Sequence, residues 1–149
     1  MSETRHAGGR VVRRALPVFV PPTGPDAPEE RRVRLPQGEL AQLRNGGEGI
    51  GYLAVLELRP GTVRGNHVHR RKRESVYVIE GSVRLVVADP DTAVCEELVL
   101  GPGDLVFIPP GVPHALAPLT VGRALEFAPE PVDPTDTERH LVMDPPRSA

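Results

Sequence analysis

Four side chains in the middle of the sequence are of the types that bind metal ions. His67 and His69 are two positions apart, and on a strand this spacing puts both imidazole rings on one face. Glu74 follows after a basic turn, and His114 comes much later, after a Pro-Gly turn. Three imidazole nitrogens and one carboxylate suit a divalent transition ion such as Zn, Fe, Mn, Ni or Co. An isolated histidine on a strand is more often an ordinary polar residue, so the interpretation depends on the surrounding sequence.

That surrounding sequence holds glycines and prolines at fixed distances from the four side chains. The first group, in order, is Gly61, five residues, His67, one residue, His69, four residues, Glu74, six residues and Gly81. The second group is Gly103, five residues, Pro109, one residue, Gly111, two residues and His114. This double pattern resembles the two sequence motifs of the cupin superfamily. The resemblance implies an antiparallel jelly-roll β-barrel with the three histidines and Glu74 pointing into its lumen around one metal ion.

A narrower resemblance concerns the reaction. The run from Arg64 to Glu74 is similar to the cupin domains of bacterial capsular-polysaccharide and deoxysugar enzymes that epimerise or isomerise nucleotide-linked ketosugars. The segments 126–128 and 133–137 are loosely similar to the ends of those domains. If this holds, we expect an enzyme that removes a proton next to a carbonyl while a metal polarises the carbonyl oxygen. Two alternatives stay open, namely an iron-dependent dioxygenase that uses the same ligands and a small-molecule-binding cupin without turnover.

Such a reaction needs a base that is not itself a metal ligand. The leading candidates are Glu126 and Tyr77, and Tyr52 and Glu57 are weaker ones, because strand facing is not secure from the sequence. For substrate binding we expect Arg64 and Lys72, which with the turn arginines could hold a diphosphate at the barrel mouth. The arginines of that turn are Arg70, Arg71 and Arg73.

The elements that must position these residues are short strands. Fifteen glycines and 18 prolines in 149 residues leave few windows for a helix, while short apolar runs between turn residues are typical of an all-β sandwich or barrel. The expected strands are 33–35, 50–58, 67–69, 75–80, 83–88, 96–100, 105–108, 115–117 and 123–128, with close spacing that favours sequential antiparallel pairing. Residues 137–143 could form one turn of helix or a strand.

Composition excludes several classes of function. The net charge of −2 argues against a general polyanion binder, and five aromatic residues without tryptophan argue against base stacking on nucleic acid and against a lectin. No apolar run is long enough for a membrane span. Cys95 is the only cysteine and cannot form an internal disulfide, which fits a reducing compartment. We therefore expect a cytoplasmic protein that acts on a small molecule and binds neither nucleic acid nor membranes.

The two ends of the chain differ from the middle. Residues 1–30 are rich in arginine and then proline, so we expect an extended or flexible, irregular arm without a ladder of backbone hydrogen bonds. Residues 31–130 would form the barrel, and 131–149 an acidic, proline-broken segment. We also expect a homodimer, in which residues 11–35 with the apolar anchor Val18-Phe19-Val20 extend the sheet of a partner.

Overall fold

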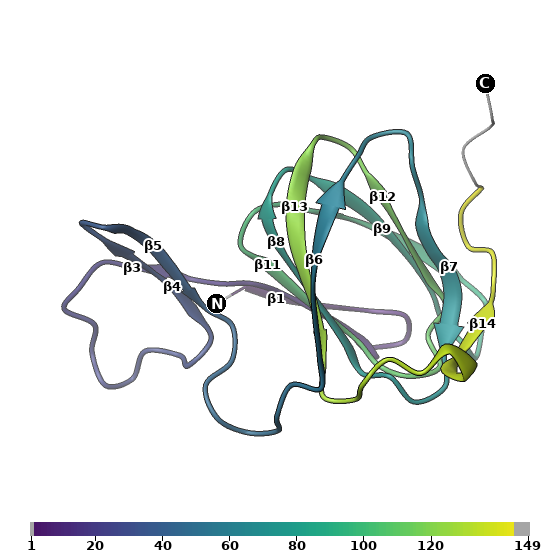
Figure 1. The fold of residues 1–149 in the computed structure, drawn as a ribbon, viewed down its shortest axis with the longest axis horizontal. Coiled ribbons are helices and arrows are strands. Elements are labelled where there is room, and N and C mark those ends of the chain that lie inside the picture. The colour runs from purple at the N-terminus through teal and green to yellow at the C-terminus, as the bar shows by residue number, and fades with distance from the viewer. Residues whose placement is uncertain (1, 145–149) are drawn as a thin grey trace.

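Two antiparallel β-sheets face each other and enclose the core (Figure 1). The structure is a computed structural model that describes residues 2–144. One sheet has the order β1-β2-β11-β8-β13-β6, with the bounds Ser2–His6, Val11–Ala15, Asp104–Ile108, Glu74–Glu80, Gly122–Ala128 and Tyr52–Leu58. The other has the order β10-β9-β12-β7-β14, with the bounds Cys95–Leu100, Val83–Ala88, His114–Pro118, Arg64–His69 and Thr137–Arg139.

The connections give the jelly-roll topology that the sequence predicted. Strands β6 and β7, β8 and β9, β10 and β11, and β12 and β13 each lie in different sheets, so the chain crosses the barrel at most of its turns. The expectation of sequential pairing was wrong for this part of the fold: in residues 52–128, only β9 and β10 are sequence neighbours that pair. The Gly- and Pro-containing turns at 59–61, 80–81 and 101–103 carry three of these crossings.

The strands expected between residues 31 and 128 are present, with ends that differ by at most three residues. The prediction of an irregular arm was wrong for residues 2–15. These residues form a β1–β2 hairpin, and β2 pairs with β11 of the same chain. Prolines begin only at Pro17, so nothing prevents these residues from making ladder bonds. The turn between the strands holds Ala7, Gly8 and Gly9 at positive φ. The domain boundaries at residues 30 and 130 stay a prediction.

A smaller sheet, which we call the wing, projects from the barrel (Figure 1, left). It consists of β3 (Val18–Phe19), β4 (Arg31–Leu35) and β5 (Gly38–Gln42), and β3 and β4 are parallel. It meets the outer face of the six-stranded sheet in a buried cluster of Leu16, Tyr77, Leu105 and Phe127, against which Ala41 and Leu43 pack.

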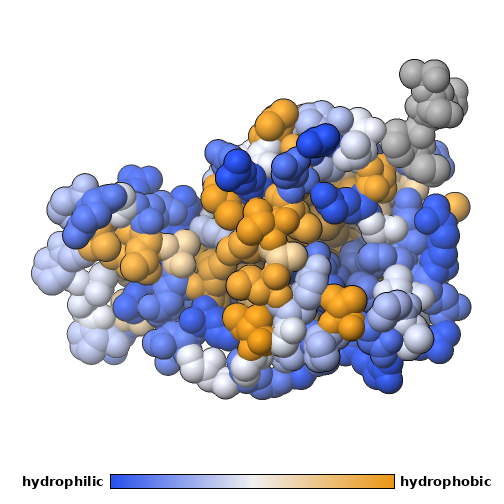
Figure 2. All heavy atoms as spheres, viewed as in Figure 1, coloured by the Kyte–Doolittle hydropathy of each residue, from blue (hydrophilic) through white to orange (hydrophobic). Residues whose placement is uncertain are grey.

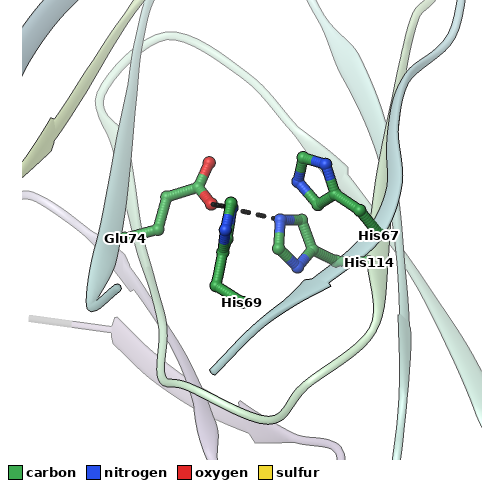
Figure 3. A group of neighbouring side chains, drawn as sticks. All are labelled: His67, His69, Glu74 and His114. Carbon is green, nitrogen blue, oxygen red and sulfur yellow. Dashed lines mark hydrogen bonds and ion pairs between the residues drawn. The ribbon is translucent and has the colours of Figure 1, made fainter. Parts of the chain in front are cut away.

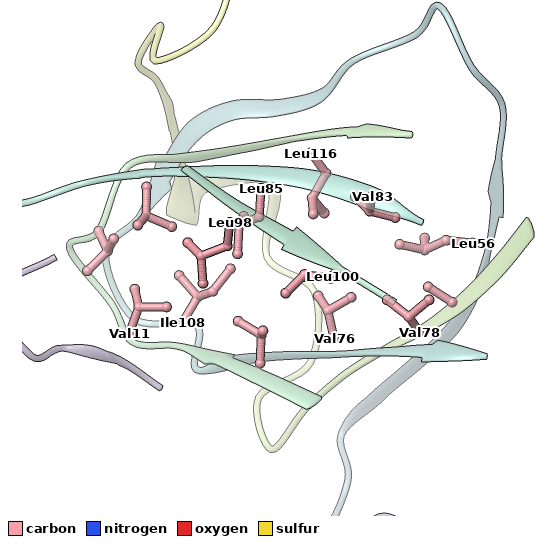
Figure 4. Close-up of a cluster of buried hydrophobic side chains, with 14 of the residues drawn as sticks. Val11, Leu56, Val76, Val78, Val83, Leu85, Leu98, Leu100, Ile108 and Leu116 are labelled. Atoms are coloured by element: carbon pink, nitrogen blue, oxygen red, sulfur yellow. The ribbon is translucent and has the colours of Figure 1, made fainter. Parts of the chain in front are cut away.

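The main core fills most of the space between the two sheets (Figure 4). Its side chains alternate along the strands with outward-facing ones, as the pleat of a strand requires. Leu85 and Leu100 are fully buried, and Leu56, Val76, Val78, Val83 and Leu116 surround them. The cavity that remains among these side chains has a volume of only about 10 Å³, so this part of the barrel is closed to ligands.

The C-terminal residues return to the barrel. A short 3₁₀ turn, η1 (Pro134–Asp136), leads into β14, which pairs with β7, so the strand alternative for 137–143 was right for 137–139. Residues 145–149 of the predicted C-terminal segment lie outside the described residues. Within residues 2–144, no helix has the length and apolar character to cross a membrane.

Candidate metal centre and active site

Three histidines and one glutamate converge inside the barrel (Figure 3). β7 contributes His67 and His69, and β12 contributes His114, which lies directly opposite His67 in the paired strands. Glu74 comes from β8 in the facing sheet. One ligand atom from each side chain lies within 4.8 Å of the others. The cluster predicted from sequence spacing is therefore brought together in space.

Hydrogen bonds orient the rings toward one point. Nδ1 of His114 lies 2.9 Å from the backbone oxygen of Val112, so it donates there and leaves Nε2 facing Glu74 at 3.1 Å. Nε2 of His69 is 3.4 Å from the same carboxylate oxygen, is buried, and has no hydrogen-bond partner in the described part of the chain. A buried polar atom without a partner is costly unless something else satisfies it. The donor set and this unsatisfied nitrogen fit a divalent ion.

The electrostatics of the cluster also suit a cation. Burial would raise the pKa of Glu74, but the hydrogen bond with His114 and the adjacent His69 ring outweigh burial and hold this pKa well below its usual range. Burial and the charges of His114 and His69 lower the pKa of His67 to about 4. The carboxylate is therefore charged and His67 is neutral near pH 7, the states in which both groups bind metals.

A second polar group adjoins the ligands. Nζ of Lys72 lies 2.5 Å from Oε1 of Glu126 and 4.6 Å from the centre of the Tyr52 ring. Burial, the charge of Glu74 and a hydrogen bond with Glu74 raise the pKa of Glu126, although Lys72 opposes this. Burial would lower the pKa of Lys72, but the charges of Glu74 and Glu126 raise it. His67, Tyr52 and Glu126 are only half-buried, so solvent approaches the cluster past them.

Two predicted site residues lie elsewhere. Tyr77 packs in the cluster under the wing, on the opposite face of β8 from Glu74. Arg64 is at the start of β7, where it reaches the backbone oxygen of Glu57 at 3.3 Å and borders the closed aliphatic end of the barrel. Neither side chain is near the four ligands.

The basic turn does not present free arginines for a diphosphate. Each arginine bonds carboxylates of other segments: Arg70 with Glu138, Arg71 with Asp133 and Asp136, and Arg73 with Glu48 and Glu130. These pairs tie the turn to its neighbours. Lys72 points inward instead, with only 9% of its surface exposed.

Sequence reasoning ranked one residue of the site too low and missed two others. Tyr52, a weaker candidate than Tyr77, is the tyrosine that lies beside Lys72 and Glu126. Thr137 contacts His69, and Asn66 precedes His67 with a positive φ of 55°. The alternation of side chains along β8 was a usable signal, because Tyr77 is three residues from Glu74 and must face the other way. Thr137 lies in the segment 133–137 that loosely resembles the ends of sugar-modifying cupin domains, but no sequence signal gave it a role.

A comparison with protein families explains why this arrangement was recognisable. Residues 54–125, which include all four ligands and both predicted motifs, match the family described as the cupin domain. These residues form a cupin domain. Among curated proteins, none gives a significant sequence match.

Solved structures share the fold of this cupin domain. A 3,4-ketoisomerase from Helicobacter canadensis is 19% identical with a TM-score of 0.66, covering 74% of this chain and 86% of the other. A dTDP-4-dehydrorhamnose 3,5-epimerase from Bacillus anthracis, with TDP and pyrophosphate bound, is 17% identical with a TM-score of 0.65, covering 78% of each chain. A variant 3,4-ketoisomerase from Thermoanaerobacterium thermosaccharolyticum, in complex with TDP-4-keto-6-deoxyglucose, is 22% identical with a TM-score of 0.62, covering 75% of this chain and 84% of the other. At these identities the likeness establishes the fold.

Proposed function

We propose that this protein is an isomerase or epimerase of a nucleotide-linked ketosugar that moves a proton at a carbon next to the carbonyl. The observation that carries the proposal is the half-buried carboxylate of Glu126 directly beside the four convergent ligands. A raised pKa suits a group that must both accept and return a proton near neutral pH. The structural neighbours that act on such sugars support the choice of substrate class.

The ligands His67, His69, Glu74 and His114 would hold one divalent transition ion, and the unpartnered Nε2 of His69 supports this assignment. When bound, such an ion would supply Lewis acidity to a carbonyl oxygen of the substrate. The buried carboxylate of Glu74 balances part of the charge of the ion, and the neutral state of His67 leaves its nitrogen available.

The remaining residues of the site handle the proton. For an isomerisation, Glu126 would take the proton from the carbon next to the carbonyl and return it to the former carbonyl carbon, while the hydroxyl proton moves to the former carbonyl oxygen. For an epimerisation, Glu126 would take the proton and a second donor on the opposite face would return one. Lys72 would hold the Glu126 carboxylate in place through their 2.5 Å contact and would offer its remaining N–H donors to a substrate oxygen. Tyr52 borders the same opening and supports the ammonium of Lys72 from the other side. Tyr77 and Arg64 have no part in this proposal.

The test is proton exchange with solvent. Purified protein incubated in deuterated buffer with TDP-4-keto-6-deoxyglucose should incorporate deuterium next to the carbonyl, as followed by proton NMR. Glu126→Gln should lower the exchange rate by about 100-fold or more, the range for loss of a general base. Glu57→Gln is the matched control, because this carboxylate lies on the outer side of β6 with 67% of its side chain exposed. Unchanged exchange in Glu126→Gln would contradict the role of Glu126.

Two other results would redirect the assignment. Iron in the purified protein together with oxygen consumption on a small organic substrate would favour the dioxygenase. Tight binding of a sugar nucleotide without deuterium incorporation would favour a binding protein. Elemental analysis together with the exchange experiment distinguishes these outcomes.

We also propose that two copies associate through the outer face of the six-stranded sheet. Apolar side chains gather on this face and continue onto the wing (Figure 2). Leu53 and Val55 of β6 are 61% and 64% exposed, and a hollow of about 370 Å³ lies between Leu53 and Leu40 of the wing. In a symmetric dimer, the wing of one copy would cover the sheet face of the other. Light scattering of the wild type should give a molar mass of two chains, and Leu53→Asp should lower the measured mass toward that of one chain.

A further inference from the structure

The strand that carries two of the ligands begins with an irregular step. His114 pairs with His67, but Ala115 pairs with Gly65, so Asn66 is an extra residue in β7 without an opposite partner. Gly65 and Asn66 both have positive φ, at 87° and 55°. A Cβ on Gly65 would lie 2.8 Å from the backbone oxygen of His114, so only glycine fits there. This is a β-bulge, and it sets the direction of the histidine that follows it.

The side chain of the bulge residue is held from outside the barrel. Asn66 is buried, and its Oδ1 accepts hydrogen bonds from the backbone N–H groups of Val142 and Met143, at 3.0 and 3.1 Å. Its Nδ2 donates to the backbone oxygen of Met143 at 2.9 Å, and its own backbone oxygen accepts from His140 at 2.8 Å. A non-glycine residue at positive φ is strained, and these four bonds offset the strain. All of them go to residues 133–143, which we call the C-terminal strap.

The strap also contacts a ligand directly. Thr137 pairs with His69 across β14 and β7, and its Oγ1 lies 3.2 Å from Nδ1 of that ring. When Nδ1–H donates to this hydroxyl, Nε2 carries no proton and is free to face the cluster. Nε2 is the buried atom without a hydrogen-bond partner noted above. By accepting from Nδ1–H, the Thr137 hydroxyl would hold His69 in the form that can bind a metal.

A third contact fixes the turn between His69 and Glu74. The carboxylate of Asp136 is buried and accepts hydrogen bonds from the backbone N–H groups of Arg71 and Lys72, at 2.9 and 3.0 Å. The backbone oxygen of Asp136 accepts from Arg70 at 3.2 Å. The strap thus holds the bulge before His67, the ring of His69 and the turn that leads to Glu74.

From these contacts we propose that the C-terminal strap is a positioning element of the metal centre. Its residues set the direction and tautomer of the ligands without binding the ion. The proposal rests on the metal site of the proposed function. It predicts that substitutions in the strap weaken metal binding in a protein that stays folded, because partners behind metal ligands typically change affinity by about 10–100-fold.

The first experiment compares threonine variants in the full chain. Thr137→Val removes the hydroxyl but keeps the shape, and Thr137→Ser restores the hydroxyl. Thr92→Val is the control, because this exposed threonine lies between β9 and β10, outside the strap. We expect Co²⁺ and Zn²⁺ affinity, measured by competition with a chelator, to fall at least tenfold in Thr137→Val and to be near wild type in the other two. Wild-type affinity in Thr137→Val would overturn the proposal.

A second measurement does not depend on the ion. In the metal-free protein, long-range ¹H–¹⁵N NMR of the imidazole should show the Nδ1–H tautomer of His69, and Thr137→Val should add the Nε2–H tautomer. The same tautomer mixture in both proteins would overturn the positioning role even if metal binds tightly. Failure of the wild type to bind any metal, with the tautomer change intact, would instead contradict the proposed function and leave the strap contact established.

The bulge is tested by Asn66→Gly and Asn66→Asp. Glycine keeps the backbone conformation but removes the three side-chain bonds, whereas aspartate keeps the acceptor for Val142 and Met143. We expect metal affinity in the order wild type, aspartate, glycine, with faster amide hydrogen exchange at His67 in the glycine variant. Equal affinity and equal exchange in all three proteins would show that the strap has no influence on the ligands.

Discussion

The two ends of the barrel lumen are built from the same strands but differ in chemistry. β8 carries Glu74 at one end and Val76 and Val78 further along, and β12 carries His114 and then Leu116. At the aliphatic end the space is filled, while at the polar end charged groups are buried close together. The same strands therefore carry aliphatic side chains that stabilise the fold at one end of the lumen and the metal-ligand side chains at the other.

The largest effect is expected from emptying the filled end. Leu100→Ala removes a fully buried side chain and should lower the free energy of unfolding by about 2–5 kcal/mol. Urea unfolding followed by circular dichroism measures this, and the exposed Val121→Ala should change stability by less than about 0.5 kcal/mol. Zn²⁺ affinity of the folded Leu100→Ala protein should be unchanged. A loss of affinity would show that the two ends are coupled.

At the polar end, Glu74→Gln removes the one negative ligand. We expect Zn²⁺ affinity to fall by more than about 100-fold, beyond the loss typical for partners behind a ligand. Isothermal titration calorimetry compares this variant with Glu80→Gln, which changes an exposed carboxylate at the other end of the same strand. Similar affinities in both variants would contradict the assignment of Glu74 as a ligand.

The two tyrosines lie on opposite sides of the six-stranded sheet, with Tyr52 facing the lumen and Tyr77 facing the wing. Tyr52→Leu removes the aromatic ring that lies 4.6 Å from Nζ of Lys72, and we expect the rate of deuterium exchange into the sugar to fall roughly 2–10-fold, the range of one cation–π contact. Tyr77→Phe should leave that rate unchanged, because Tyr77 packs under the wing. The opposite result would show that the outer face takes part in the reaction.

The smallest effect concerns pH. The pKa of His67 is about 4 in the folded chain against 6.5 for free histidine, so between these values the unfolded chain binds a proton that the folded chain does not. Stability of the metal-free protein should therefore fall as the pH drops from 6.5 to 4. His67 is half-exposed, so the effect should be well below the about 1.4 kcal/mol per pKa unit of a fully buried group. Thermal unfolding of His67→Gln should show a smaller decline than that of the wild type over the same pH range.

These comparisons also explain what the sequence could predict. The ligand cluster was predictable because spacing in strands fixes which side chains share a face, and the turn residues around it limit how the strands meet. The prediction that Tyr77 faces the site was wrong, although the inward position of Glu74 three residues earlier in the same strand shows that Tyr77 faces outward. The strap was not predictable, because Asn66 and Thr137 act through partners that are distant in sequence and have no local pattern.

The hairpin of residues 2–15 was missed because its arginines suggested a solvated arm, whereas Arg13 and Arg14 bond Asp104, Glu3 and Glu30.

The pairing of β14 with β7 has a consequence for the order of assembly during synthesis. Thr137 and His69 are 68 residues apart, and every barrel strand other than β14 precedes Thr137 in the chain. Because a chain leaves the ribosome from its N-terminus, the aliphatic core can close before residues 133–143 are available. The ligands would then reach their final directions last, and metal loading would follow the folding of the barrel.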